Sequence, residues 1–203
     1  MSRPDRRIGI VLAAGAATRF GGGKLAALIR NEPLIAHAIR AARAAPVERV
    51  LVVASFTLAV GEWPGEPPVE VVRVTSGALS QSLAAGITAA QAAGAEAAYV
   101  FLADMPLIPL ATSVSLADRL GDAYAAVPVC QGRPGHPVLF ARRAFPDLLA
   151  LSGDEGAGRL LRGRADVVRV PIDDPGILLD VDVPGDISRL SERTGDAGEG
   201  DGG

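Results

Sequence analysis

Residues 8–24 read IGIVLAAGAATRFGGGK, a short apolar run that leads into a glycine-rich loop. The run Ile8–Ala13 is a candidate buried strand, because Ile, Val, Leu and Ala follow one another without polar alternation. The loop continues to about Asn31, which is longer than the usual two to six residues, and long loops of this kind are usually functional. Glycines let backbone N–H groups approach a polyphosphate, and Arg19 and Lys24 would neutralise its charge. The stretch therefore predicts a nucleotide-binding loop after the first strand of an α/β sheet.

Two commoner phosphate-binding motifs do not fit this loop. A Walker A motif would need Gly at position 18 and Ser or Thr at position 25, where the chain has Thr18 and Leu25. A Rossmann fingerprint would need a third glycine where Ala26 stands. The other explanation is a flexible surface turn, but two cations placed directly after the first strand favour phosphate binding.

Apolar runs typical of strands alternate with Ala-rich segments typical of helices along the whole chain. This alternation predicts right-handed βαβ units and a single three-layer α/β/α domain with a mostly parallel, Rossmann-like nucleotide-binding sheet. We expect this domain over residues 1–192 and a disordered tail over 193–203. The predicted strands are Ile8–Ala13, Arg49–Ala54, Val69–Val74, Ala97–Ala103, Ala123–Val129, Pro137–Ala141 (a candidate antiparallel insertion), Val167–Val170 and Leu178–Val181. The predicted helices are Pro33–Ala45, Ser82–Ala93, Pro109–Leu120, Ala144–Leu151, Gly156–Gly163 and Pro184–Glu192.

Composition excludes several classes of function. The net charge of −3 over 203 residues, without a basic cluster, argues against a nucleic acid partner. The one cysteine, Cys130, excludes an intramolecular disulfide and a Cys-rich zinc site, and its apolar surroundings predict a buried thiol. No apolar stretch approaches the roughly 20 residues that span a bilayer, and no signal-peptide pattern is present. We therefore expect a cytoplasmic protein without a membrane partner.

Two aspartates follow predicted strands, at the sheet edge where open α/β sheets bind ligands. Asp104, in the stretch FLADMP, is an isolated carboxylate that would suit Mg²⁺, although it would also suit a helix or turn cap. Asp180 and Asp182 alternate along the last predicted strand and would face the same side. Asp182 precedes Pro184, so a helix cap, a second metal ligand, or both, remain open.

Two further segments are candidates for substrate contact. Ser80 and Ser82 precede or begin an Ala-rich segment, where serine is a common N-cap and where hydroxyls could also touch a base or ribose. His136 lies in a tight Gly/Pro loop, and its ring could meet a substrate. His37, on a predicted helix, is most simply structural.

These motifs, in their order and spacing, resemble the MobA-like NTP transferases, and most of all the molybdenum cofactor cytidylyltransferase branch. The resemblance covers nearly the whole chain, from LAAGAATRFGGGK through PLIAHAI, LSQSLAAGI, FLADMP and GHPVLF to LLDVDVPGD. It implies catalytic roles for Arg19, Lys24 and Asp104, a Mg²⁺ site at Asp104 and Asp182, and acceptor binding by His136. It also implies nucleotide binding by Leu12, Ala13, Ala14, Gly15, Arg19, Lys24, Ser80 and Ser82.

The reaction that the resemblance implies joins CTP to the terminal phosphate of molybdopterin and releases pyrophosphate, with a molybdenum hydroxylase as a recipient of the product. Leu-Ala-Ala-Gly in the first loop favours cytidine over guanosine. The sequence departs from the family pattern at Ala17, Pro134 and Gly158, and the last two fall where the acceptor would bind. Another phosphorylated acceptor, such as a sugar phosphate, and a non-catalytic cofactor carrier therefore remain open alternatives.

Overall fold

The computed structural model describes residues 6–15, 23–75, 78–153, 156–183 and 185–187. Arg19 and the predicted tail at 193–203 lie outside these residues, as does most of the predicted helix Pro184–Glu192. Only residues 185–187 of that helix are described, and they are helical.

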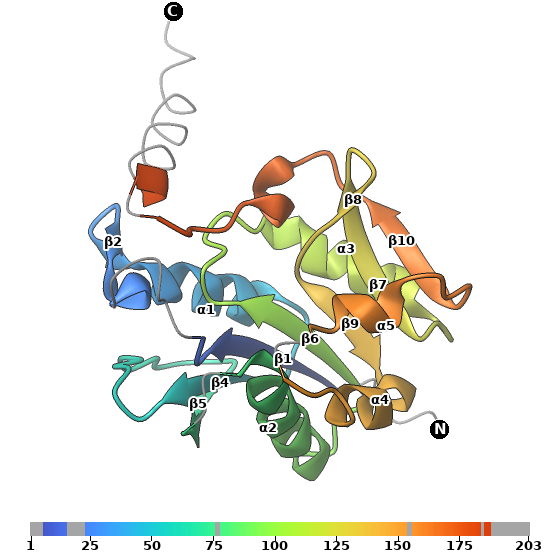
Figure 1. Ribbon diagram of the computed structural model, residues 1–203, viewed down its shortest axis with the longest axis horizontal. Coiled ribbons are helices and arrows are strands. Elements are labelled where there is room, and N and C mark those ends of the chain that lie inside the picture. The colour runs from blue at the N-terminus through green and yellow to red at the C-terminus, as the bar shows by residue number, and fades with distance from the viewer. Residues whose placement is uncertain (1–5, 16–22, 76–77, 154–155, 184, 188–203) are drawn as a thin grey trace, which may run out of the picture.

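The described chain is built on a large sheet whose strands run in the order β10-β7-β9-β6-β1-β4-β5, with β8 paired to β7 at one end (Figure 1). All pairs are parallel except those of β9 with β6 and β7, and that of β8 with β7. The antiparallel insertion expected at Pro137–Ala141 is thereby confirmed. The strands are β1 (Arg7–Ala13), β4 (Arg49–Ser55), β5 (Val69–Val74), β6 (Ala97–Leu102), β7 (Ala125–Cys130), β8 (Arg133–Pro134), β9 (Val138–Ala141) and β10 (Val167–Pro171).

Helices cover both faces of this sheet and create two separate apolar layers. On one face, α1 (Leu34–Ala44) and α3 (Leu110–Leu120) pack against side chains such as Val11 and Tyr99. On the other face, α2 (Leu79–Ala92) and α4 (Phe145–Leu149) pack against Ile10 and Phe140. The short helix α5 (Gly158–Leu161) lies on this second face (Figure 1). Strands buried on both sides explain the unbroken apolar runs in the sequence, and the predicted α/β/α domain is confirmed.

The order of the strands reverses at β1, which defines where a ligand is expected. The chain passes from β1 to β4 and β5 on one side, and then returns to form β6 on the other side of β1. The loops after β1 and β6 therefore diverge from neighbouring strands, and this opens a crevice at their carboxyl ends. The side chains in these two loops are the ones that the fold brings together.

Small elements that the sequence did not predict connect the larger ones. The 3₁₀ turn η2 (Lys24–Ala26) ends the glycine-rich loop, and β2 (Leu28–Ile29) and β3 (Glu32–Pro33) form a small separate hairpin. A second 3₁₀ turn, η3 (Arg142–Ala144), precedes α4. The ring of His37 contacts this hairpin, with Nε2 3.2 Å from the carbonyl oxygen of Ile29. This contact agrees with a structural role for His37.

The prediction of a strand at Leu178–Val181 is wrong. The chain forms the 3₁₀ turn η4 (Pro175–Leu178) and then runs without regular structure to Asp182. β6 already pairs with β1 and β9, so this segment cannot join the sheet beside it. Its backbone bonds to loops instead: the N–H of His136 donates to the carbonyl oxygen of Ile177, and the N–H of Val181 donates to that of Asp104. Asp180 and Asp182 therefore do not share a strand face.

Two remaining expectations concern burial and the membrane. Cys130 is buried and carries a free thiol, as predicted. Among the described residues, no helix has the length and apolar character needed to cross a bilayer.

Candidate functional site

A small polar pocket of about 220 Å³ lies at the carboxyl ends of β1 and β6, in the crevice that the strand order predicts. Its residues come from the ends of the two strands, the end of the glycine-rich loop and the segment after η4. They are Leu12, Ala13, Gly15, Lys24, Leu25, Ala103, Asp104 and Asp182. Ala14 is buried beside the pocket but does not line it. We call this the charged pocket.

Lys24 is the centre of the charged pocket. Its Nζ donates to Oδ2 of Asp104 over 2.9 Å and to Oδ1 of Asp182 over 3.3 Å. The preceding residue, Gly23, has φ +67, a left-handed conformation that glycine adopts without strain and that turns the chain toward the pocket. Three residues that are far apart in the chain are thus joined at one point.

The Lys24 ammonium is held in its charged form, even though the residue is only 8% exposed. Burial acts to lower the pKa of Lys24, but the hydrogen bonds and charges of Asp104 and Asp182 outweigh burial and raise the pKa above its ordinary value. The cation and the two anions compensate one another, and all three face the same space. The arrangement can therefore exchange partners with an incoming ligand that carries both a polyanion and a cation.

The two aspartates are positioned by backbone contacts between their loops. The carbonyl oxygen of Asp104 accepts from the N–H of Val181 over 3.0 Å. The side chain of Asp186 then accepts from the N–H groups of Asp182 and Val183, both over 2.9 Å. Asp182 thus begins a turn that Asp186 closes, and its own carboxylate is left to face Lys24. Within the described chain, no group of three or more His, Cys, Asp and Glu side chains is placed to hold a metal ion, so any ion here would take its remaining ligands from elsewhere.

Ser80 and Ser82 do not cap a helix as expected. Helix α2 begins at Leu79, three residues earlier than predicted, and its N-cap is Ala78. Both serines are buried in the first turn: the Ser80 hydroxyl donates to the Gly153 carbonyl over 2.6 Å, and the Ser82 hydroxyl donates to Ala78 over 3.1 Å. The Ser80 bond fixes Gly153 against α2, the Ser82 bond stays within the start of the helix, and neither serine lines the charged pocket.

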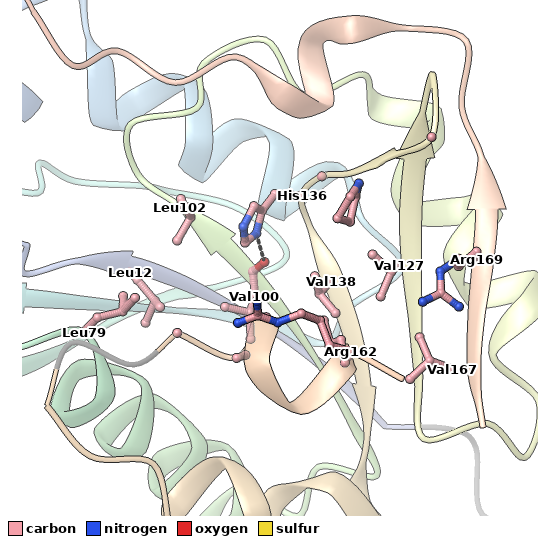
Figure 2. A pocket seen from close by; sticks show the side chains of 17 residues that line it. Leu12, Leu79, Val100, Leu102, Val127, His136, Val138, Arg162, Val167 and Arg169 are labelled. Atoms are coloured by element: carbon pink, nitrogen blue, oxygen red, sulfur yellow. Dashed lines mark hydrogen bonds between the residues drawn. The ribbon is translucent and has the colours of Figure 1, made fainter. Parts of the chain in front are cut away.

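A second, larger cavity of about 410 Å³ lies next to the charged pocket, and Leu12 lines both. Its floor is the face of the sheet that carries α2, and its cover includes the loop before β9 and helix α5 (Figure 2). The lining side chains are mostly aliphatic, with His136, Arg162 and Arg169 as its polar members. We call this the apolar cavity.

His136 lies on the wall of the apolar cavity, where Figure 2 shows its ring beside β6, with Nδ1 3.5 Å from the Val100 carbonyl oxygen. Burial lowers the pKa of His136, while the Val100 contact and the charges of Asp104 and Asp180 oppose this effect only in part. The imidazole is therefore neutral at neutral pH and can offer one donor or one acceptor to a ligand.

Gly135 allows His136 to occupy this place. A Cβ added at Gly135 would overlap the carbonyl oxygen of Ile177, because η4 packs directly on this loop. The N–H of His136 donates to the same oxygen over 2.9 Å. The Gly/Pro character of the loop thus reflects close packing against η4 as well as a turn.

The structure places the predicted residues as follows. Lys24, Asp104 and Asp182 meet in the charged pocket, with Leu12, Ala13 and Gly15 around them, whereas His136 faces the neighbouring cavity. Arg19 lies outside the described residues.

Sequence reasoning missed Arg162 and Arg169, which line the apolar cavity. Arg169 did carry a signal: it stands two residues after Val167 on a strand, so both side chains point to one sheet face, and a charge on such a face is unusual. Arg162, just after α5, carried none.

Comparisons with known proteins bear on the family and the fold of the chain. The sequence model of the MobA-like NTP transferase domain matches residues 9–169. The purine catabolism protein PucB of Bacillus subtilis (strain 168) is 30% identical over 191 residues, covering 87% of this chain and 92% of that protein. The crystal structure of a homologue of Mycobacterium tuberculosis rv0371c from Mycobacterium sp. strain JC1 superposes with a TM-score of 0.82 at 29% identity, over 95% of this chain and 98% of that one. Rv0371c of Mycobacterium tuberculosis H37Rv, solved in complex with manganese, gives a TM-score of 0.70 at 26% identity, over 92% and 98% of the two chains.

Proposed function

The chain belongs to the MobA-like NTP transferase family, and we propose that it transfers CMP from CTP to the terminal phosphate of molybdopterin, with release of pyrophosphate. The observation that carries this proposal is the contact of Lys24 with Asp104 and Asp182, at the edge of the sheet where β1 and β6 diverge. A cation from the glycine-rich loop and two carboxylates from distant loops are the groups that a bound triphosphate and its counter-ion require.

In the proposed reaction, an oxygen of the acceptor phosphate attacks the α-phosphorus of CTP. The bond from the α-phosphorus to the oxygen that bridges it to the β-phosphorus breaks, and the electron pair leaves with pyrophosphate. The attacking oxygen is already ionised at neutral pH, so the reaction needs no strong general base. The mechanism leaves no proton for His136 to remove, so its neutral ring serves only as a hydrogen-bonding group. Catalysis then rests on positioning and charge neutralisation.

Each residue has a distinct task in this mechanism. Gly15 offers its backbone to the phosphates, and the Leu12–Gly15 segment holds the nucleotide. Lys24, together with Arg19, stabilises the negative charge that develops on the departing pyrophosphate. Ser80 and Ser82 act indirectly: Ser80 holds the Gly153 carbonyl at the start of α2, and Ser82 bonds within the start of the helix.

The donor set also fits a divalent cation. Asp104 and Asp182 are partly exposed carboxylates, they face one pocket, and they already share one positive charge. Mg²⁺ prefers one or two carboxylates, with phosphate oxygens and water as its other ligands, so we propose that these two residues hold it. When bound, the ion supplies positive charge to the phosphate oxygens. The manganese complex of the mycobacterial relative supports a divalent metal in this fold.

The test is a matrix of the four nucleoside triphosphates against molybdopterin or a sugar phosphate, with Mg²⁺, Mn²⁺ or EDTA, read by pyrophosphate release. We expect release with CTP and molybdopterin only when a divalent metal is present. Turnover that prefers another nucleotide, or a sugar phosphate acceptor, would retain the reaction type and replace the substrate. No release with any combination would refute a catalytic role.

A second candidate is a non-catalytic accessory protein that binds nucleotide and cofactor and delivers the cofactor to a molybdenum hydroxylase. It is kept open by the name of the Bacillus relative, which refers to purine catabolism and states no transferase activity. A binding titration beside the same assay separates the two candidates. Binding of CTP and molybdopterin without release of pyrophosphate would support the carrier. The Lys24 arrangement favours the enzyme, because a carrier has no leaving group to stabilise.

A further inference from the structure

The two carboxylates of the charged pocket are held in different ways. Asp104 comes two residues after the end of β6, and the sheet fixes its position, because the N–H of Ala103 donates to the carbonyl oxygen of Leu12 over 3.1 Å. Asp182 belongs to no strand or helix, since the chain from the end of η4 to Asp182 has no regular structure. The side chain of Asp182 is also 54% exposed, against 28% for that of Asp104. Contacts other than those of the sheet must therefore hold Asp182 in place.

On its N-terminal side, Asp182 is anchored by Val181. The Val181 side chain is fully buried and packs with Ile29 and Leu34 in a small apolar cluster. Its N–H donates to the carbonyl oxygen of Asp104 over 3.0 Å, so the backbones of the two pocket loops are joined one residue before Asp182. This anchor fixes the loops against each other, but rotation of the chain after Val181 would still turn the Asp182 carboxylate away from the pocket.

On its C-terminal side, Asp182 is held by the carboxylate of Asp186. Oδ2 of Asp186 accepts from the N–H groups of Asp182 and Val183, each over 2.9 Å. Hydrogen bonds to a carboxylate are stronger than those between neutral groups. The N–H of Asp186 in turn donates to the carbonyl oxygen of Val183 over 3.0 Å. These three bonds fix the backbone that carries the Asp182 side chain, and that side chain is left to contact Lys24 over 3.3 Å.

We propose that Asp186 is a positioning residue, which orients Asp182 as the second carboxylate for the divalent cation. This inference rests on the proposed function, since it takes Asp104 and Asp182 as the residues that hold the cation. Asp186 does not line the charged pocket, so it acts through Asp182 and not by contact with the ion. Groups that orient a metal ligand typically contribute about 10–100-fold to metal affinity. The loop ligand Asp182 depends on such support, whereas β6 supplies it for Asp104.

The test is a titration with Mn²⁺ alone, in which electron paramagnetic resonance measures the ion that stays free. We expect Asp186→Ala to raise the Kd for Mn²⁺ at least about tenfold, while circular dichroism shows an intact fold. Asp186→Asn should recover most of the wild-type affinity, because its amide oxygen can still accept from both N–H groups. A long-range effect of the Asp186 charge would weaken binding equally in both variants, and equal weakening would overturn the inference.

A double-mutant cycle shows whether Asp186 acts through Asp182. In an Asp182→Ala background, Asp186→Ala should cause no further loss of Mn²⁺ affinity, because the ligand that it positions is already gone. A further loss of similar size in that background would mean that Asp186 supports the pocket as a whole, and it would refute the positioning role.

Asp174→Ala is the matched control, because Asp174 makes the same kind of bond in the same part of the chain. Its Oδ1 accepts from the N–H of Gly176 over 2.7 Å, at the start of η4. Loss of this bond should lower the free energy of unfolding measured with urea, as loss of the Asp186 bonds should, but it should leave the Kd for Mn²⁺ unchanged. A comparable rise of this Kd in Asp174→Ala, or a wild-type Kd in Asp186→Ala, would overturn the proposal.

This outcome is separable from the fate of the proposed function. The Mn²⁺ titration needs neither a nucleotide nor an acceptor, so it decides the role of Asp186 even if no pyrophosphate is ever released. Conversely, if the wild-type enzyme converts CTP and molybdopterin and Asp186→Ala binds Mn²⁺ as the wild type does, the reaction stands and the role of Asp186 is refuted.

Discussion

The charged pocket and the apolar cavity share Leu12 but use charge in opposite ways. In the charged pocket, the Lys24 cation is compensated by two carboxylates within hydrogen-bond distance. In the apolar cavity, two guanidiniums stand without a described acidic partner. A compensated site can release its internal partners when phosphate and metal arrive together, whereas an uncompensated one selects a ligand of one sign. This contrast is our reason to propose that chemistry belongs to the first region and selection to the second.

The largest expected effect is the loss of the charged pocket. Lys24→Ala and Asp104→Ala should each lower the rate of pyrophosphate release by ~10²–10³-fold, because each removes a group that stabilises charge in the transition state. Circular dichroism should show an intact fold. Asp180→Ala is the matched control: Asp180 is exposed, it lies two residues before Asp182, and it does not line the charged pocket. Near-normal release by the Lys24 or Asp104 variant would contradict the assignment.

The next effect is on stability and concerns the wall between the two regions. Gly135→Ala should lower the free energy of unfolding by about 1–3 kcal/mol, because its Cβ would overlap the Ile177 carbonyl and displace η4. Urea unfolding measures this change. Gly158→Ala should show no such loss, since a Cβ there meets nothing within 4 Å. If the two variants proved equally stable, the close packing of η4 on the loop would be doubtful.

A smaller effect should separate the two regions directly. Gly158→Leu places an isobutyl group in the apolar cavity without a clash at its Cβ. We expect an acceptor KM raised roughly tenfold, which corresponds to about 1.4 kcal/mol of lost binding, and an unchanged Kd for CTP by calorimetry. Weaker CTP binding in this variant would mean that the nucleotide, and not the acceptor, enters the cavity.

The smallest effect is a pH dependence at His136. Its pKa is lowered in the folded protein, mainly by burial, so below the ordinary value of 6.5 the unfolded chain takes up a proton that the folded chain resists. Stability from this residue is therefore present above about pH 6.5 and declines as the pH falls through the folded-state pKa. His136→Gln should reduce the difference in urea midpoint between about pH 7.5 and pH 5.5. An identical difference in both proteins would show that His136 does not contribute.

The fold could be predicted from the sequence to the extent that it depends on local pattern. Seven of the predicted strands, such as Ile8–Ala13 and Val69–Val74, correspond to β1, β4, β5, β6, β7, β9 and β10, because short runs rich in Val, Ile, Leu and Ala are typical of strands. The strand at Leu178–Val181 was predicted wrongly because its apolar residues serve loop packing, where backbone pairing is set by distant partners. The start of α2 was missed because Ala78 caps it without a side-chain signal.

The charged pocket and the apolar cavity also differ in how far they could be predicted from the sequence. Lys24, Asp104 and Asp182 could be proposed because each follows a strand or loop with a recognisable motif, and strand order then brings them together. The apolar cavity could not be predicted, because its floor is formed by single valines from four strands whose neighbours in the sheet are not adjacent in the sequence. Its far end at Arg169 depends on β10 pairing with β7, a choice that local pattern does not encode.

The long separation between Lys24 and Asp182 has a consequence for the order of events during translation. The two residues are 158 positions apart, and every strand of the large sheet precedes Asp182 in the chain. A ribosome that has released residues up to about 171 has delivered the entire sheet, the first loop and Asp104, but not the second carboxylate. A nascent chain at that stage would leave Lys24 bound to Asp104 alone. If the metal proposal holds, stalled chains of graded length should acquire tight manganese binding only after Asp182 has emerged.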